Sequence, residues 1–372
     1  MSDVNIVFGS DFHIGNTKIS AAETHLNLKD YFYPELENAN ILFLGGDFFD
    51  RSLKLDDPSS LEVISIIQEL IEFADKYNIK IRVLRGTFTH DRKQNEVFNF
   101  SLSKSKTHVD LVCIDTLSLE LIQEYGLRVL YIPDNLPYKS KDEVMEVIDD
   151  LLKTYGWEYV DLVIGHGYFE HVLPPGMTHY PTITFEYDDF KSIVKGYVLM
   201  GHVHTSSIYK NVIYNGSFER FAHNEEERKG FYVINKTNEK WSYKFIENKD
   251  TPLFCTIEVS GDDAHILQNE VEGFISRKFP KDIGYLRIVH KDASIRQMLM
   301  QCVHDNHPNI IVTTKTIKEP TEKKQVIRQF QTSTYISPTK ENIPSLVIDF
   351  LKQVKGNTNL TEAVIKNILQ LE

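Results

Sequence analysis

The sequence predicts an α/β protein that carries a second, smaller α+β domain. Short apolar segments alternate with amphipathic helical segments up to about residue 195, after which strand and hairpin patterns dominate. A further strand–helix–strand pattern follows from about residue 250. With 372 residues the chain exceeds the usual size of one hydrophobic core, so at least two domains are expected.

The first half alternates strands with helices. Each expected strand is a short apolar run that ends in glycine or a polar residue, and each expected helix has apolar residues at helical spacing. The strands cover residues 5–10, 40–46, 80–86 and 160–165, and the helices cover residues 61–77 and 143–156. Strands and hairpins are then expected over residues 195–204, 206–217 and 230–246.

The C-terminal third divides into three parts. Residues 249–315 are expected to form the small domain, with a helix near residues 264–279 between two strands. The polar, charged residues 316–340 are expected to be a linker. Two short amphipathic helices are expected in residues 341–372, separated near Gly356. The first domain is then residues 1–248.

Composition excludes several classes of protein. No apolar run approaches the roughly 18 residues of a membrane span, and the N-terminus lacks the basic region of a signal peptide. Cys113, Cys255 and Cys302 form no CxxC pair, which argues against a disulfide framework and fits a reducing, cytoplasmic compartment. The net charge of −12 argues against a stand-alone nucleic-acid binder, unless a basic patch, a metal site or a basic partner offsets it.

Aspartate or histidine follows five of the expected strands at the point where each strand ends. These residues are Asp11 and His13, Asp47 and Asp50, His90 and Asp91, His166, and His202 and His204. Functional sites of α/β sheets lie at the carboxyl ends of the strands. We therefore expect these side chains to converge, although they are nearly 200 positions apart.

The residue types indicate a centre with two metal ions. The candidate ligands are two carboxylates and four imidazoles: Asp11, His13, Asp47, His166, His202 and His204. This set exceeds what one tetrahedral ion with an open position requires. It suits two ions that share a carboxylate, the arrangement that activates water and clamps both oxygens in a displacement at phosphorus.

Each motif alone has an ordinary explanation. The DxH motif by itself is a poor signal, GDFFD can be a turn followed by a helix cap, and HVH can be two histidines of an edge strand. Their shared position at strand ends, in this order, favours the metal centre over these alternatives.

The ordered motifs resemble the calcineurin-like metallophosphoesterase superfamily. They are D-x-H at Asp11, GD-x-x-D at Gly46, a glycine-to-His-Asp loop at Gly86, GH at Gly165 and GHxH at Gly201. The segment YNGSFERFAHNEEERKGFYVI at residues 214–234 is similar to the one after GHxH in SbcD-type nucleases, including phage recombination endonucleases. The resemblance implies a metallophosphoesterase β-sandwich flanked by helices, a small capping domain and C-terminal ATPase-binding helices.

The resemblance also implies roles for single residues. One ion is bound by Asp11, His13 and His204, Asp47 bridges, and His166 and His202 bind the other ion. His90 faces the phosphate and assists the leaving oxygen, and Asp91 orients His90. Asp50 has no assigned role, because the corresponding position varies in the family. The ions are expected to be Mn²⁺, with Mg²⁺ as the alternative.

One loop departs from the family pattern. The family has Gly-Asn-His-Asp, whose asparagine is a ligand of the second ion, whereas this chain has Gly-Thr-Phe-Thr-His-Asp at residues 86–91. Thr87 or Thr89 can replace the amide with a hydroxyl, or water can fill the place. A hydroxyl is a poorer ligand than an amide oxygen, so we expect weaker occupancy of the second site.

These expectations together describe a metal-dependent DNA nuclease of repair and recombination. The resemblance implies DNA, an SbcC-type SMC-like ATPase and a second copy of the chain as partners, with no membrane, in the cytoplasm or in a host cytoplasm for a viral chain. Two alternatives remain: another calcineurin-like enzyme, such as a cyclic-nucleotide or protein phosphatase, and a catalytically weak scaffold for the ATPase.

Overall fold

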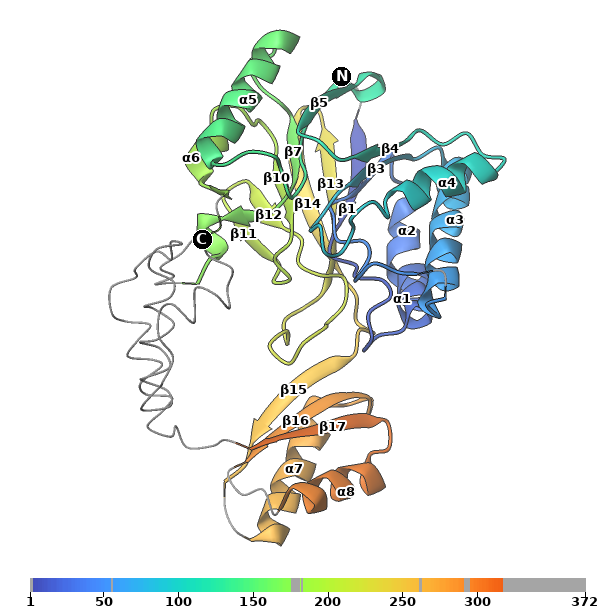
Figure 1. Cartoon of the computed structure of the whole chain (residues 1–372), viewed down its shortest axis with the longest axis vertical. Coiled ribbons are helices and arrows are strands. Elements are labelled where there is room, and N and C mark those ends of the chain that lie inside the picture. Colours follow the sequence, from blue (N-terminus) through green and yellow to red (C-terminus); the bar gives the residue numbers. More distant parts are fainter. Residues whose placement is uncertain are drawn as a thin grey trace, which may run out of the picture.

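The computed structural model describes residues 3–54, 56–174, 181, 183–260, 263–290 and 295–316. The tail expected at residues 341–372, and the expected linker beyond residue 316, lie outside these ranges. The fold is the predicted α/β class, with two six-stranded mixed sheets flanked by helices (Figure 1).

The first sheet contains the N-terminal strands. Its order is β14 (Lys240–Glu247), β13 (Gly230–Thr237), β1 (Val4–Gly9), β2 (Ile41–Leu44), β3 (Lys80–Leu84) and β4 (Leu111–Ile114). Strands β1 to β4 are parallel to one another, and β13 runs antiparallel to β1. The carboxyl ends of β1, β2 and β3 therefore lie along one edge of this sheet.

The second sheet supplies the other strand ends. Its order is β11 (Ser207–Tyr209), β12 (Val212–Tyr214), β10 (Val198–Gly201), β7 (Leu162–His166), β6 (Leu127–Ile132) and β5 (Ser118–Ile122). Strands β12, β10, β7 and β6 are parallel, and β11 pairs antiparallel with β12 in the predicted hairpin. A short parallel pair, β8 (Tyr168–Phe169) and β9 (Thr184–Phe185), follows β7.

Helices cover the outer face of each sheet (Figure 1). The first sheet is covered by α1 (Ala21–Asn27), a π-helical turn (Leu28–Phe32), α2 (Tyr33–Leu36), α3 (Ser59–Tyr77) and α4 (Glu96–Lys104). The second is covered by α5 (Lys141–Tyr155) and α6 (Tyr187–Phe190). None of the helices in the described ranges has the length and apolar character needed to span a bilayer.

Local sequence explains where the two longest helices of the sandwich end. Ser140 caps α5 by accepting a hydrogen bond from the backbone N–H of Glu143, and Gly156 ends the helix in the left-handed conformation with φ of 67°. Asn78 ends α3 in the same way, with φ of 55°. Both observed helices begin two residues before the ranges expected from apolar spacing, because the periodicity does not mark the caps.

Successive side chains of β1 point to opposite faces of the first sheet and enter two different cores. Ile6 and Phe8 point between the two sheets, where they pack with Tyr131 of β6 and Leu199 of β10. Val7 points the other way, into the core between the first sheet and its helices. The molecule thus has a helix–sheet–sheet–helix arrangement, and the strand ends of the two sheets can meet.

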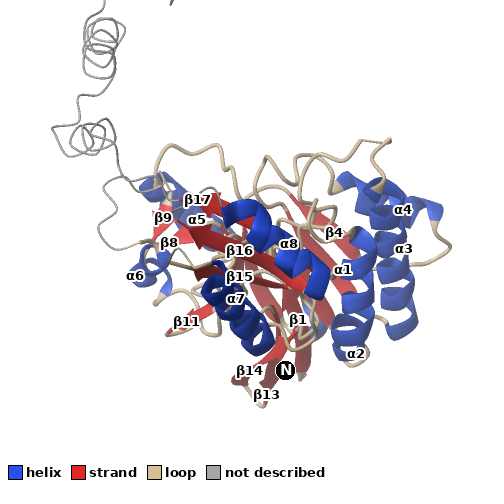
Figure 2. Cartoon of the chain, turned by 90° about the horizontal axis from the view of Figure 1, so that it is seen from below, coloured by secondary structure: helices blue, strands red, loops and turns tan. Residues whose placement is uncertain are grey.

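A three-stranded parallel sheet follows the sandwich (Figure 2). It consists of β15 (Leu253–Glu258), β16 (Gly284–His290) and β17 (Ile310–Thr316), with α7 (Ala264–Lys278) and α8 (Arg296–Asn306) packed on it around a separate core. The Tyr285 hydroxyl donates to the Lys18 carbonyl, and His223 Nδ1 lies 3.0 Å from the Cys255 carbonyl. These contacts attach the small sheet to the loop after β1 and to the β12–β13 connection.

Candidate metal centre

The predicted ligands lie together where strands of both sheets end. Asp11 and His13 follow β1, Asp47 follows β2, His166 ends β7, and His202 and His204 follow β10. They form two groups whose potential ligand atoms lie within 4.8 Å of one another: Asp11, His13 and His204, and Asp47, His166 and His202. The structure therefore brings together all the residues that the sequence analysis selected as ligands.

The first group is centred on two facing imidazoles. Nε2 of His13 lies 3.0 Å from Nε2 of His204. Asp11 is fully buried, and both its oxygens accept the backbone N–H of His202, at 3.0 Å each. Ser10 Oγ donates to Asp11 Oδ2 at 2.5 Å. The carboxylate is thus fixed by the loop after β10, which itself carries two of the predicted ligands.

The second group lies beside Thr87, one of the two threonines that the sequence analysis considered as ligands. Nδ1 of His202 lies 3.3 Å from Nε2 of His166. Thr87 Oγ1 lies 3.1 Å from Asp47 Oδ2, 3.4 Å from His166 Nε2 and 3.2 Å from His202 Nδ1. Of the two candidate threonines, Thr87 is therefore the one whose hydroxyl reaches this group, whereas Thr89 is exposed.

Asp47 lies between the two groups. Its Oδ2 is 3.3 Å from His166 Nε2 and 3.9 Å from His13 Nε2. Burial alone would raise the pKa of Asp47, but the charge of His166 and its hydrogen bond to Asp47 outweigh burial and hold this pKa below its usual range. The carboxylate is therefore ionised and faces both groups, as a bridging ligand must.

Hydrogen bonds to the second ring nitrogen orient two of the imidazoles. His166 Nδ1 lies 2.8 Å from the Gly45 carbonyl, which can only accept, so the ring presents Nε2 to the centre. His204 Nδ1 lies 3.0 Å from Glu225 Oε1 in the same way. Lys229 is buried and pairs with the other oxygen of Glu225 at 3.0 Å. Glu225 was not among the residues selected from the sequence, because nothing in the sequence indicates that it contacts His204.

The donor atoms fit a bound cation. Burial lowers the pKa of His13 to about 3 and that of His202 to about 4, so both rings are neutral, the form that binds metal. Burial would also lower the pKa of His166, but the Asp47 charge raises it to about 10. His166 must therefore release a proton before it binds metal, and the facing nitrogens of the two histidine pairs, at 3.0 Å and 3.3 Å, are close enough for each pair to share one cation. The buried clusters can therefore hold metal.

The backbone is strained at these positions. Asp11, His13, Asp47 and His202 have φ values of 54°, 45°, 51° and 90°, a region that residues other than glycine rarely adopt. Such strain persists where the surrounding structure fixes it, and it concentrates at functional sites. Glycine is required beside these residues at Gly86, where a Cβ would lie 2.2 Å from the Asp47 backbone nitrogen.

His90 and Asp91 have different surroundings from those expected. Nδ1 of His90 is hydrogen-bonded to the Asp50 carbonyl, and the His90 ring lies edge-on to His13 with 4.7 Å between centroids. The expectation that Asp91 orients His90 is wrong, because the Asp91 carboxylate accepts from backbone N–H groups of Gly86 at 2.7 Å and Asp47 at 2.9 Å. Asp91 positions the loops instead, and burial followed by the Asp47 charge raises its pKa to about 7.

Asp50 lies beside the first group. Its Oδ1 is 3.6 Å from His13 Nδ1 and accepts from Asn16 Nδ2 at 2.8 Å. A third set of potential ligand atoms comprises His13, Asp50 and His90. Asp50 thus faces the ring nitrogen of His13 that points away from His204, a position from which it can orient His13.

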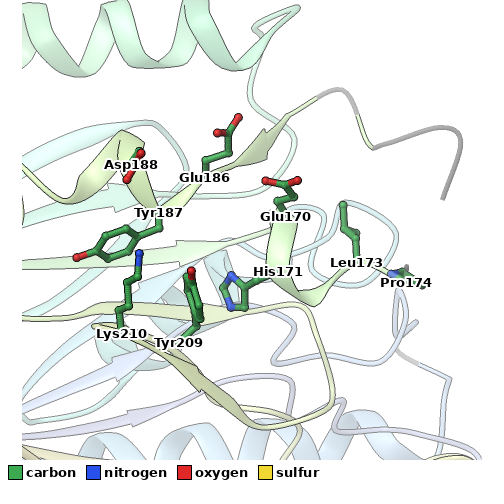
Figure 3. Close-up of a pocket in the computed structure, with 9 residues that line it drawn as sticks. All are labelled: Glu170, His171, Leu173, Pro174, Glu186, Tyr187, Asp188, Tyr209 and Lys210. Carbon is green, nitrogen blue, oxygen red and sulfur yellow. The ribbon is translucent and has the colours of Figure 1, made fainter. Parts of the chain in front are cut away.

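A cavity of about 490 Å³ lies on the second sheet (Figure 3). It is lined by Glu170, His171, Leu173, Pro174, Glu186, Tyr187, Asp188, Tyr209 and Lys210. His171 stacks on Tyr209 with centroids 4.8 Å apart, and Lys210 Nζ lies 3.7 Å from the Tyr187 ring centre. No predicted ligand lines this cavity, so it is separate from the metal centre.

Comparisons with known proteins add little to this geometry. No family model and no curated protein matches the chain. One solved structure is similar over 66% of this chain and 99% of its own length, with 11% identity and a TM-score of 0.34. A likeness this distant carries no argument about function.

Proposed function

We propose that the chain is a metal-dependent phosphodiesterase that cleaves DNA, as an SbcD-type nuclease does. One observation supports this most: two groups of aspartate and histidine, drawn from the ends of four strands, face each other across the ionised Asp47. A ligand set of carboxylates and imidazoles without thiolate is more typical of Mn²⁺ than of the Zn²⁺ in a closed structural site. The proposal therefore includes two divalent ions, with manganese as the preferred metal.

The chain's own residues would divide the work. Bound divalent ions would supply an activated water and positive charge at phosphorus. The carboxylate of Asp47 would hold the two sites at a fixed separation. His90 donates Nδ1–H to the Asp50 carbonyl, so its Nε2 is the nitrogen available to a phosphate oxygen. Asp91 would keep the loops of Asp47 and Gly86 in place through their backbone N–H groups.

Two variants test this division of roles. Asp47→Asn should abolish both calorimetric Mn²⁺ binding and hydrolysis of linear duplex DNA. His90→Gln should retain Mn²⁺ binding and lower turnover by roughly 10²- to 10⁴-fold, the usual contribution of a general acid or base. His108→Gln is the control, because His108 is exposed. Full activity of the His90 variant, or unchanged metal binding in the Asp47 variant, would contradict the proposal.

The partners proposed for this nuclease are inferred from the family resemblance. An SbcC-type ATPase and a second copy of the chain would add DNA affinity that a chain of net charge −12 lacks. Deleting residues from about 335 onward should disrupt ATPase binding, measured by co-purification, and leave hydrolysis of a small phosphodiester intact. Retained ATPase binding would place the contact elsewhere.

Thr87 favours one competing function, a catalytically weak scaffold for the ATPase. A hydroxyl stands in the second group where the family has an amide oxygen. Purified protein that binds Mn²⁺ but cleaves neither DNA nor a small phosphodiester, with or without the ATPase, would support the scaffold. Cleavage of the small ester without cleavage of DNA would instead indicate another phosphoesterase.

A further inference from the structure

The loop at residues 86–91 holds an exposed aromatic ring beside the metal centre. Thr87 reaches the second group of ligands through its hydroxyl, and the His90 ring packs edge-on against His13. Phe88 lies between these two residues, yet 52% of it is exposed. Phe88 directly follows Thr87 in the chain, so the Cα atoms of these two residues are about 3.8 Å apart.

Backbone hydrogen bonds anchor the loop, although its aromatic residue is exposed. The Thr87 backbone N–H donates to Asp47 Oδ1 at 2.6 Å, and the Thr87 carbonyl accepts from the N–H groups of His90 at 2.9 Å and Asp91 at 3.0 Å. Burying a phenylalanine usually stabilises a fold by about 1.5–3 kcal/mol. Much of that gain is not used here, because 52% of Phe88 is exposed.

A positively charged side chain, Arg92, lies beside the Phe88 ring. The Arg92 guanidinium carbon lies 5.9 Å from the centre of the Phe88 ring, and Arg92 and Lys93 are both exposed. Proteins bind single-stranded nucleic acid by stacking bases on aromatic rings while cations contact the phosphates. In a chain of net charge −12, a local arginine and lysine beside the centre are what such a contact requires.

We propose that Phe88 and Arg92 form a nucleotide subsite next to the cleaved bond. The base adjoining the scissile phosphate stacks on Phe88, and a backbone phosphate of the same strand pairs with Arg92. This inference rests on the proposed function and names the part of the substrate that the site recognises. Because every base presents a flat face, the subsite selects a nucleic-acid strand without selecting its sequence.

A second exposed pair provides a matched control. Phe100 on α4 is 61% exposed, and Lys104 Nζ lies 5.5 Å from its ring centre. Like Phe88 and Arg92, the pair is an exposed phenylalanine with a cation at a similar distance from its ring. Neither member is among the residues that the structure places in the metal-ligand groups.

The test is equilibrium binding of a short fluorescent single-stranded oligonucleotide, measured with Ca²⁺ in place of the catalytic metal. Phe88→Ala should weaken binding about 5- to 150-fold, the range expected for the loss of one stacked base. Phe88→Trp should preserve binding, and Phe100→Ala should match the wild type. Arg92→Ala should reduce the slope of log affinity against log salt by about 0.7.

Abasic substrates locate the stacked base. Removing the base beside the scissile phosphate should weaken wild-type binding and leave binding by Phe88→Ala unchanged, because the two changes remove one interaction. Equal binding by Phe88→Ala, Phe100→Ala and wild type would overturn the subsite. Absence of any hydrolysis by the wild type would overturn the proposed function instead, and the binding comparison would still decide on the subsite.

Discussion

Replacing Glu219 with glutamine is expected to stabilise the protein at neutral and alkaline pH. Glu219 is fully buried in the connection between β12 and β13, and its Oε1 accepts a hydrogen bond from Asn27 Nδ2 at 2.8 Å. Burial raises the pKa of this carboxyl from 4.5 to about 7, although hydrogen bonds such as that from Asn27 act in the opposite direction. Glutamine retains the acceptor for Asn27 and cannot ionise.

The sign of the effect follows from proton binding. Between the unfolded pKa of 4.5 and the folded pKa of about 7, the folded state binds more protons than the unfolded state. Stability of the wild type therefore falls as pH rises through this window and stays lower above it. Each pKa unit corresponds to about 1.4 kcal/mol, so the full difference of 4.5 to about 7 amounts to about 3 kcal/mol.

Urea unfolding of both proteins across pH measures this difference. The free energy of unfolding of Glu219→Gln should exceed that of the wild type by roughly 1 kcal/mol at about pH 5 and about 3 kcal/mol at about pH 8.5. Glu270→Gln on the exposed face of α7 is the control, for which no pH-dependent difference is expected. A constant difference between Glu219→Gln and wild type over this range would refute the reasoning.

Three further predictions concern the centre and the fold. Thr87→Asn should tighten the weaker of two calorimetric Mn²⁺ binding events, because an amide oxygen replaces a hydroxyl in the second group; unchanged affinities would exclude Thr87 as a ligand. Glu225→Gln should weaken Mn²⁺ binding about 10- to 100-fold by the loss of the charged partner of His204, measured by the same titration. Arg82→Met should lower the free energy of unfolding, measured by thermal denaturation, by about 1.5–3 kcal/mol, because Glu120 loses the charged hydrogen bond from Arg82 at 2.6 Å. Arg82→Met combined with Glu120→Gln should recover part of that loss.

The sequence predicts the strands that carry the site better than it predicts the rest of the sandwich. Apolar runs before Asp11, Asp47 and His166 are buried on both faces, so composition alone marks them as strands. Strands β4 and β5 were not predicted, because alternating residues such as Val112 and Leu121 are exposed apolar side chains and give no regular pattern. The short π-helical turn after α1 also has no signature in side-chain type.

The candidate ligands were predictable because aspartate or histidine recurs at the ends of five strands, whereas their supports were not. Glu225 and Gly45 act on His204 and His166 through contacts across long stretches of chain, which composition does not reveal. The role of orienting His90 was assigned to Asp91 because the family resemblance implies it. Backbone N–H groups of Gly86 and Asp47 compete for the same carboxylate, and the tight approach of those two loops decides the contact.

The strained backbone of the centre has a structural support that explains how it persists. The loops after β1 and β2 continue the parallel pairing beyond their strands: Asp11 N–H donates to the Gly46 carbonyl at 3.0 Å, and His13 N–H donates to the Asp47 carbonyl at 3.0 Å. Asp11 and His13 thus each donate, and Asp47 accepts, a backbone hydrogen bond that relaxation would break. A backbone hydrogen bond contributes about 1 kcal/mol, which is comparable to the cost of a left-handed residue. The pairing therefore fixes the ligand directions before any ion binds, so metal affinity need not supply the energy to organise the loops.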